Sequence, residues 1–252
     1  NFNEECRSIV LRYTSEWRKT VERMARWVDF DNDYKTMDRD FMESVWWVFK
    51  QLWDKGLIYE GLKVVPYSWR ISTPLSNFEA NLNYQDVQDP SVTLRFRVIG
   101  EPDSHLLAWT TTPWTLPSNM ALCAGPELTY VKLRECASGT CYYLVKNRVE
   151  AHFESGSYEI LEEMPGTALQ GMCYEPLFDF AKNHVDTSKA WTVQLDDYVS
   201  DESGTGLVHL ACFGEDDVRI FQREGLPVFD PVDDEGNFRE STDFIAGLNI
   251  KD

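Results

Sequence analysis

A row of hydroxyl side chains lies near the middle of the chain, in the stretch AWTTTPWTLPSN from Ala108 to Asn119. Thr110, Thr111 and Thr112 follow an apolar run, and two nearby prolines restrict the backbone that presents them. Because a hydroxyl group both donates and accepts hydrogen bonds, a rigid row of them can hold a water molecule or a carbonyl oxygen. The alternative is structural, since the branched threonine side chain also suits the pleated surface of a strand.

A second stretch, DESGTGLVHLACFGEDD from Asp201 to Asp217, combines glycines, a histidine and three consecutive acidic residues. Glycine permits close approach of a backbone, the imidazole of His209 can donate to a hydroxyl group, and a carboxylate can bind an ammonium group. Such a set is suited to recognising an α-amino group. The alternatives are a histidine that is satisfied inside a barrel and an ordinary acidic first turn of a helix.

Short strands are the elements that must position both stretches. From Gly61 onward, apolar runs such as VTLRFRV, LLAWTTT, ALCAG, TYVKL and CYYLVK alternate with Gly, Pro, Asn and Asp, and LKVVPY, YEILEEM, WTVQLDDYV and GLVHLA continue the pattern. Many short runs at irregular spacing favour a closed or nearly closed β-barrel. Two segments, KNRVEAHFES and EDDVRIFQREG, are predicted to be helical, and the residues from Phe229 to Asp252 to form a loop with one short hairpin.

The first 60 residues have helical periodicity instead. ECRSIVLRYTSEWRKTVERMARWVDF contains neither Gly nor Pro, and a second pattern, FMESVWWVFKQLWDKG, ends at Gly56, a suitable C-cap. We expect a packed helix pair that carries no chemistry. The sequence thus predicts an α+β chain with an N-terminal helical lead-in, residues 1–60, and a β-barrel domain with flanking helices, residues 61–252.

Composition narrows the classes of function. The chain has 252 residues, of which 43% are hydrophobic, and this is enough for a large core. Its formal net charge of -18 argues against binding of nucleic acid by phosphate neutralisation. The six cysteines are scattered without zinc-knuckle spacing, so we expect no metal and no cofactor. No apolar run is long enough for a membrane span and NFNEECRSIV is not a signal peptide, which predicts a soluble, cytoplasmic chain.

Together, the two polar stretches match a known family. AWTTTPWTLPSN closely resembles the threonine-rich motif of the editing domain in isoleucyl-tRNA synthetases, and GTGLVHLACFGEDD is similar to the second motif of that domain, GTG-x-VH-x-AP-x-FGEDD. NDYKTMDRDFMESVWWVFKQLWDKGLIY and TPLSNFEANLNY look like the segments that lead into this insertion in the eukaryote-like form. The valyl and leucyl relatives carry TTRPE or TTRPD at the first motif, so TTTPWT points to the isoleucyl enzyme.

The resemblance runs through nearly the whole chain and implies its function. HIGH and KMSKS, the signatures of the aminoacylation core, occur nowhere in the sequence, so we expect the isolated connective polypeptide insertion of a class I synthetase, without amino acid activation. A pocket built for isoleucine cannot strongly reject valine, which is one methylene smaller, and a second site that destroys the mischarged product corrects the error. The resemblance therefore implies hydrolysis of valine from the CCA end of isoleucine tRNA, with the remainder of the synthetase as partner in cis.

Motif position also implies the roles of single residues. Asp217 corresponds to the anchor of the substrate amino group, and His209 to the residue that shapes the far end of the pocket and excludes isoleucine. Thr111 and Thr112 correspond to groups that contact the aminoacyl moiety or the attacking water. Thr110, Thr115 and Asn119 correspond to supporting residues. Trp114 corresponds to a residue that forms a wall of the pocket or faces the adenosine.

The chemistry implied is direct attack by a positioned water, assisted by the free ribose hydroxyl. Cys212 lacks the placement of a nucleophile, because neighbours on one strand point to opposite faces and no third group is evident to orient a base. HLACFGEDD is one residue shorter than the family pattern and lacks its proline, and alignment on the intact FGEDD makes Asp217 the anchor rather than Asp216. Two alternatives remain: a module that binds the aminoacyl-tRNA 3′ end without hydrolysis, and an unrelated β-barrel carrier of small molecules.

Overall fold

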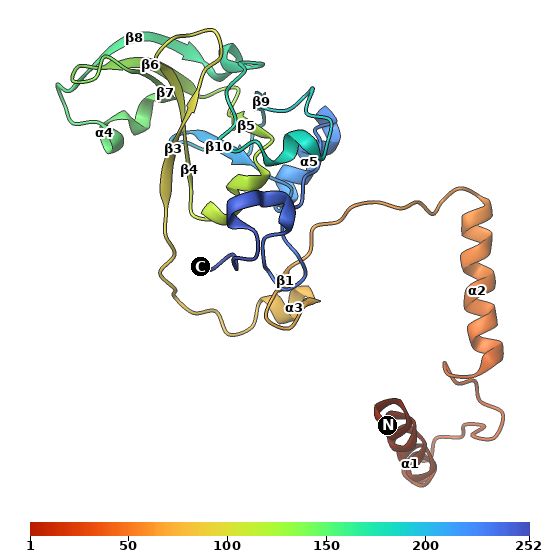
Figure 1. The fold of residues 1–252 in the computed structure, drawn as a ribbon. Coiled ribbons are helices and arrows are strands. Elements are labelled where there is room, and N and C mark those ends of the chain that lie inside the picture. Colours follow the sequence, from red (N-terminus) through yellow and green to blue (C-terminus); the bar gives the residue numbers. More distant parts are fainter. The chain divides into compact units, whose positions relative to one another are not determined.

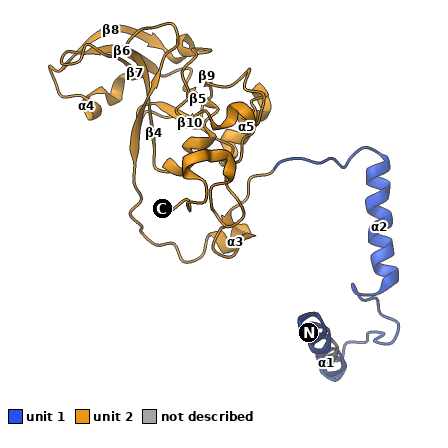
Figure 2. Cartoon of the chain, viewed as in Figure 1, with its two compact units in different colours: residues 1–62 blue, residues 63–252 orange. Residues whose placement is uncertain are grey.

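The computed structural model describes residues 1–10 and 12–252 and divides into two compact units, residues 1–62 and residues 63–252 (Figure 2). The first unit holds two long helices, α1 (Phe2–Arg23) and α2 (Arg39–Asp54). Both were predicted and are confirmed. Gly56 follows α2 with φ +68, the left-handed conformation that ends a helix most readily at glycine.

The expected packing of this helix pair is wrong. None of the residues of α2 is buried, and Trp17, Trp46 and Trp53 expose 67%, 69% and 60% of their surface. Amphipathic periodicity identifies an apolar face but does not identify the element that covers it. Among the described residues of the first unit, neither helix buries the aromatic face of the other.

The second unit contains three separate sheets (Figure 1). The largest has the strand order β3-β4-β7-β6-β8, the second has the order β10-β5-β9, and β1 pairs with β2 alone. In chain order the strands are β1 (Tyr67–Ser68), β2 (Thr73–Pro74), β3 (Val92–Arg97), β4 (Ser104–Thr110), β5 (Ala121–Ala124), β6 (Thr129–Glu135), β7 (Cys141–Val145), β8 (Tyr158–Pro165), β9 (Thr192–Leu195) and β10 (Leu207–Leu210).

The predicted β-barrel is therefore wrong, because none of the three sheets closes. Closure of the large sheet would require its edge strands β3 and β8 to pair with each other, and they lie at opposite ends of the strand order. After β4 the chain enters a 3₁₀ helix, η1 (Pro113–Ser118), and its next strand, β5, joins the other sheet. Strand number and spacing cannot reveal this switch, because they do not specify which strands are neighbours.

Alternation of side chains along the strands builds the core in layers. One cluster lies between the two larger sheets and includes Phe96 and Leu106 from one and Leu122 and Leu207 from the other. Residues on the opposite face of the three-stranded sheet pack against α5 (Glu215–Glu224), and those on the outer face of the five-stranded sheet against α4 (Val149–His152). The three-stranded sheet is thus covered on both faces, and this fixes its position relative to α5.

Most local predictions are confirmed, with one exception. LKVVPY is not a strand, apart from Tyr67 at its end, whereas the segments predicted helical contain η2 (Lys146–Arg148), α4 and α5. The segment from residue 229 onward is mostly turn, with isolated bridges and η5 (Glu240–Ile245). The short remaining elements are α3 (Asn77–Ala80), η3 (Gly166–Leu169) and η4 (Phe180–Asn183). No described helix combines the length and apolarity needed to cross a membrane.

Candidate functional site

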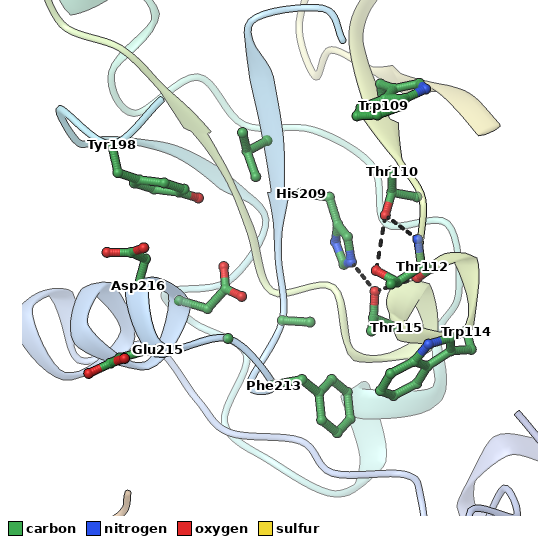
Figure 3. Close-up of a pocket in the computed structure, with 14 residues that line it drawn as sticks. Trp109, Thr110, Thr112, Trp114, Thr115, Tyr198, His209, Phe213, Glu215 and Asp216 are labelled. Carbon is green, nitrogen blue, oxygen red and sulfur yellow. Dashed lines mark hydrogen bonds between the residues drawn. The ribbon is translucent and has the colours of Figure 1, made fainter. Parts of the chain in front are cut away.

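Both sequence motifs line one cavity of about 400 Å³ in the second unit (Figure 3). The register of β10 against β5 explains why the two motifs meet. In β10, His209 lies opposite Leu122 and Leu210 lies opposite Ala121, so His209 reaches the start of β5, which η1 precedes directly. The cavity therefore brings together the end of β4, η1, β10 and the first turn of α5, and the side chains that the sequence predicted for it are Thr110, Thr112, Trp114, Thr115, His209 and Asp217.

A chain of hydrogen bonds holds His209 from both sides. The Tyr174 hydroxyl donates to Asn119 Oδ1 over 2.7 Å, and Asn119 Nδ2 lies 2.9 Å from Nδ1 of His209. On the other side of the ring, Nε2 lies 2.8 Å from the hydroxyl of Thr115, which donates to the carbonyl oxygen of Thr112 over 2.8 Å. Since an amide nitrogen can only donate, Nδ1 must accept, and the proton of the neutral ring resides on Nε2.

His209 is thus a neutral and immobilised ring. It is 7% exposed, and burial lowers its pKa to about 4. Both ring nitrogens already have partners inside the protein, so neither is free to act as a base toward a ligand. The ring can limit the size of a ligand in the cavity. Asn119 is buried and contacts His209 but does not itself line the cavity.

The three threonines of the hydroxyl row do not all face the same space. The hydroxyls of Thr110 and Thr112 lie 3.3 Å apart, and Thr110 Oγ1 also accepts from the backbone N–H of Thr112 over 3.1 Å (Figure 3). Both line the larger cavity, whereas Thr111 lines a second cavity of about 240 Å³. The row therefore runs along two adjoining spaces.

The second cavity adjoins the first and is rich in hydroxyl groups. The two share Trp109, Thr110, Tyr198 and Val208. The hydroxyl residues that line only the second are Thr111, Ser200, Ser203 and Thr205. Together the cavities can hold a ligand with two parts, one small and one able to form several neutral hydrogen bonds.

Of the three acidic residues that begin α5, Asp217 is the one suited to bind a cation. It forms no ion pair with any described residue, whereas Asp216 is exposed and pairs with Arg219 over 2.9 Å. Burial raises the pKa of Asp217 to about 7, the backbone N–H of Gly214 opposes the rise, and Asp216 adds to it. A Cβ atom at residue 214 would lie 2.3 Å from Oδ2 of Asp217, so this position of the carboxylate requires glycine.

Comparison with known proteins decides the family. The model of the class I tRNA synthetases (I, L, M and V) matches residues 1–208. The chain belongs to this family.

Relatives confirm the resemblance to the isoleucyl enzymes. The chain is 52% identical over its whole length to the cytoplasmic isoleucine–tRNA ligase of Mus musculus and 50% identical to the isoleucine–tRNA ligase of Bdellovibrio bacteriovorus. It spans only 20% and 24% of the length of these two relatives. Among solved structures, the P. knowlesi cytosolic leucyl-tRNA synthetase editing domain matches with 12% identity and a TM-score of 0.42, over 57% of this chain and 67% of that one.

The sequence reasoning missed Tyr198, which lines both cavities. Tyr198 lies in the connection between β9 and β10, and both of these strands pair with β5. A tyrosine in a stretch such as LDDYVSDES has no spacing that marks it as a site residue. Only the strand order, with β5 at the centre, brings this connection next to the hydroxyl row.

The cysteines offer no nucleophile in the cavity. Burial raises the pKa of the Cys212 thiol to about 12, and its Sγ lies 3.4 Å from the carbonyl oxygen of Phe229. The shortened segment around it places Phe213 against Trp114, with ring centroids 4.8 Å apart. Among the described residues, no three His, Cys, Asp or Glu side chains gather in a way that could hold a metal ion.

Proposed function

We propose that this chain is the editing region of an isoleucine-specific synthetase and that it hydrolyses valine esterified to the 3′ end of isoleucine tRNA. The observation that carries the proposal is an unpaired, half-buried carboxylate, Asp217, in the same cavity as a hydroxyl row and an immobilised neutral histidine. A small ligand with an ammonium group and an ester fits this set of groups.

The ammonium group is the part of the substrate that Asp217 binds. A half-buried carboxylate without a cation is unfavourable, which its raised pKa reflects, and a bound ammonium group would remove that cost. Charge-assisted hydrogen bonds of this kind contribute about 1.5 to 3 kcal/mol. Asp216 cannot replace it, because Arg219 already neutralises that carboxylate.

The ester then lies beside the threonines, and the terminal adenosine occupies the second cavity. Thr110 and Thr112 supply hydroxyls for the carbonyl oxygen or for an attacking water. Thr111 and the serines of the second cavity supply hydrogen bonds to the ribose. Hydrolysis by a positioned water, assisted by the ribose hydroxyl, requires no covalent intermediate, in keeping with the high pKa of Cys212.

The rest of the synthetase is the partner that delivers the tRNA. A chain with a net charge of -18 cannot bind the tRNA body by phosphate neutralisation, but a single-stranded CCA end needs few contacts. The exposed aromatic face of α2, which includes Trp46 and Trp53, is suited to pack against that remainder. We place the protein in the cytoplasm, as for the relative of Mus musculus named cytoplasmic.

Release of valine tests the proposal. The chain is mixed with isoleucine tRNA that carries either radiolabelled valine or radiolabelled isoleucine, and free amino acid is measured over time. We expect valine to be released faster than in buffer and isoleucine to be retained.

Binding without hydrolysis is the second candidate, favoured by the shortened HLACFGEDD segment. Protection of the valyl ester from spontaneous hydrolysis, instead of its release, would support that function and contradict the first. The Thr112→Val variant serves as a control for release of valine. It removes a hydroxyl from the cavity while keeping the shape of the side chain, so it should release valine more slowly than the parent.

A further inference from the structure

Tyr198 carries a buried polar atom without a partner. Its hydroxyl is buried and has no hydrogen-bond partner among the residues that the structure describes. The side chain lines both cavities, and Figure 3 shows its ring across the cavity from the threonines, with the hydroxyl directed inward. A buried hydroxyl that lacks a hydrogen bond is unfavourable, so a group in this position indicates a ligand that completes it.

The connection that carries Tyr198 is fixed to the helix that carries Asp217. Asp196 accepts from the backbone N–H of Tyr198 over 3.3 Å and binds both Arg219 and Arg223 of α5, at 2.8 and 2.7 Å. Asp196 is 8% exposed, and the hydrogen bonds from Arg219 hold its pKa well below its usual range. These contacts link the segment that carries Tyr198 to the helix that carries Asp217.

We propose that the Tyr198 hydroxyl accepts a hydrogen bond from the α-ammonium group of the substrate, so that Asp217 and Tyr198 bind this group together. The proposal rests on the proposed function and assigns a second residue to its amino-group site. An ammonium group has three N–H donors, and a single carboxylate leaves at least one of them free for another acceptor. Asp217 supplies the charge and Tyr198 a neutral acceptor.

Charge favours the ammonium group over the ester carbonyl as the partner of this hydroxyl. Burial raises the pKa of Tyr198 well above its usual range, and the acidic side chains of Asp217, Asp216 and Asp196 add to the rise. The hydroxyl is therefore neutral. Because arginines pair with Asp216 and Asp196, the negative field at this hydroxyl comes from Asp217. Such a field stabilises a cation but opposes the negative charge that develops on a carbonyl oxygen during hydrolysis.

Binding of a non-hydrolysable ligand tests the assignment. The probe is adenosine with valine attached at the 2′ position through an amide in place of the ester, and a second probe has hydrogen in place of the α-amino group. Calorimetry with the whole chain compares the parent, Tyr198→Phe and the control Tyr84→Phe, whose side chain is 82% exposed. We expect Tyr198→Phe to bind the valyl probe about tenfold or more weakly, because a hydrogen bond to a charged group is lost. Binding of the probe without the amino group should not change.

Each result bears on the assignment or on the function. If Tyr198→Phe weakens both probes by the same factor, the hydroxyl contacts another part of the ligand and the ammonium assignment is wrong. If Tyr198→Phe binds the valyl probe as the parent does, the assignment is overturned while the proposed function stands. If the parent itself does not bind the valyl probe, the proposed function and the assignment are both overturned.

Discussion

Asn119 donates its side-chain amide to Nδ1 of His209 over 2.9 Å, and this contact determines which ring nitrogen carries the proton. The same amide group accepts from Tyr174 and donates to the carbonyl oxygen of Ala121, so its orientation is fixed by two further partners. The buried tyrosine and amide thereby control a ring that lines the cavity.

Replacement of this amide should change the protonation of His209. In Asn119→Asp a carboxylate would accept from Nδ1–H, which reverses the tautomer and raises the pKa of His209 from about 4. The measurement is ¹⁵N and ¹H NMR of the imidazole as a function of pH. Asn147→Asp, a change at an exposed residue, is the matched control. An unchanged tautomer in Asn119→Asp would show that Thr115, not Asn119, controls the ring.

Acid should destabilise the fold through His209. Its pKa is about 4 in the folded protein and near 6.5 in the unfolded chain, so the unfolded state binds more protons between these values. The contribution of His209 to stability is therefore complete above pH 6.5 and is lost as the pH falls toward 4, by on the order of 3 kcal/mol. The free energy of unfolding, measured in urea at several pH values, should fall less in His209→Gln than in the parent. Parallel curves for the two proteins would contradict this account.

The sequence predicted the parts of this site better than their arrangement. Helix and strand positions follow from apolar periodicity, and the two polar motifs were found from residue type alone. Separation of Thr111 from Thr112 into different cavities depends on where β4 ends and η1 begins. The open sheets and the position of Tyr198 both depend on β5 pairing with β9 and β10, a long-range relationship that no local pattern encodes.

Asp217 should influence stability in the opposite direction with pH. Its pKa is raised to about 7 in the folded protein, so the folded state binds more protons than the unfolded chain between about pH 4 and 7. The contribution of Asp217 to stability therefore falls as the pH rises through this range. Asp217→Asn removes the effect and should be more stable than the parent at pH 8 but not at pH 4, whereas Asp216→Asn loses only an exposed ion pair with Arg219. Urea unfolding at both pH values provides the comparison.

The variants Asp217→Asn and Asp216→Asn should also differ in their release of valine. Asp217→Asn removes the negative charge that we propose to bind the ammonium group, so release of valine should fall at least tenfold. Asp216→Asn should retain most of the activity. The reverse order would mean that Asp216 is the anchor and that the alignment on FGEDD is displaced by one residue.

Thr112 and Thr111 should differ in their effects, because they line different cavities. Thr112→Val removes a hydroxyl that lies 3.3 Å from that of Thr110, and it should lower the maximal rate of valine release. Thr111→Val should act mainly on the affinity for the adenosine end. Rates measured over a range of substrate concentrations distinguish the two effects. Two valine variants that both release valine as the parent does would make the hydroxyl row structural.

His209 should act as a filter of ligand size. Isoleucine and valine present identical polar groups, so an editing site can refuse isoleucine only by steric means. The ring is suited to this role, because it is buried and both of its nitrogens are engaged by Asn119 and Thr115. Overpacking of a rigid site costs about 1 to 3 kcal/mol, which corresponds to rejection by roughly tenfold to a hundredfold.

Removal of the ring should therefore admit the larger amino acid. We expect His209→Ala to release isoleucine from isoleucine tRNA when the parent does not, with a smaller change in the release of valine. Because this substitution also removes the partners of Asn119 and Thr115, circular dichroism must first show that the fold is intact. Thr115→Val, which disrupts the hydrogen bond to Nε2 but keeps the ring, is the matched control and should not admit isoleucine. A folded His209→Ala variant that releases neither amino acid would mean that His209 orients the reacting groups, and the size filter would have to lie elsewhere in the cavity.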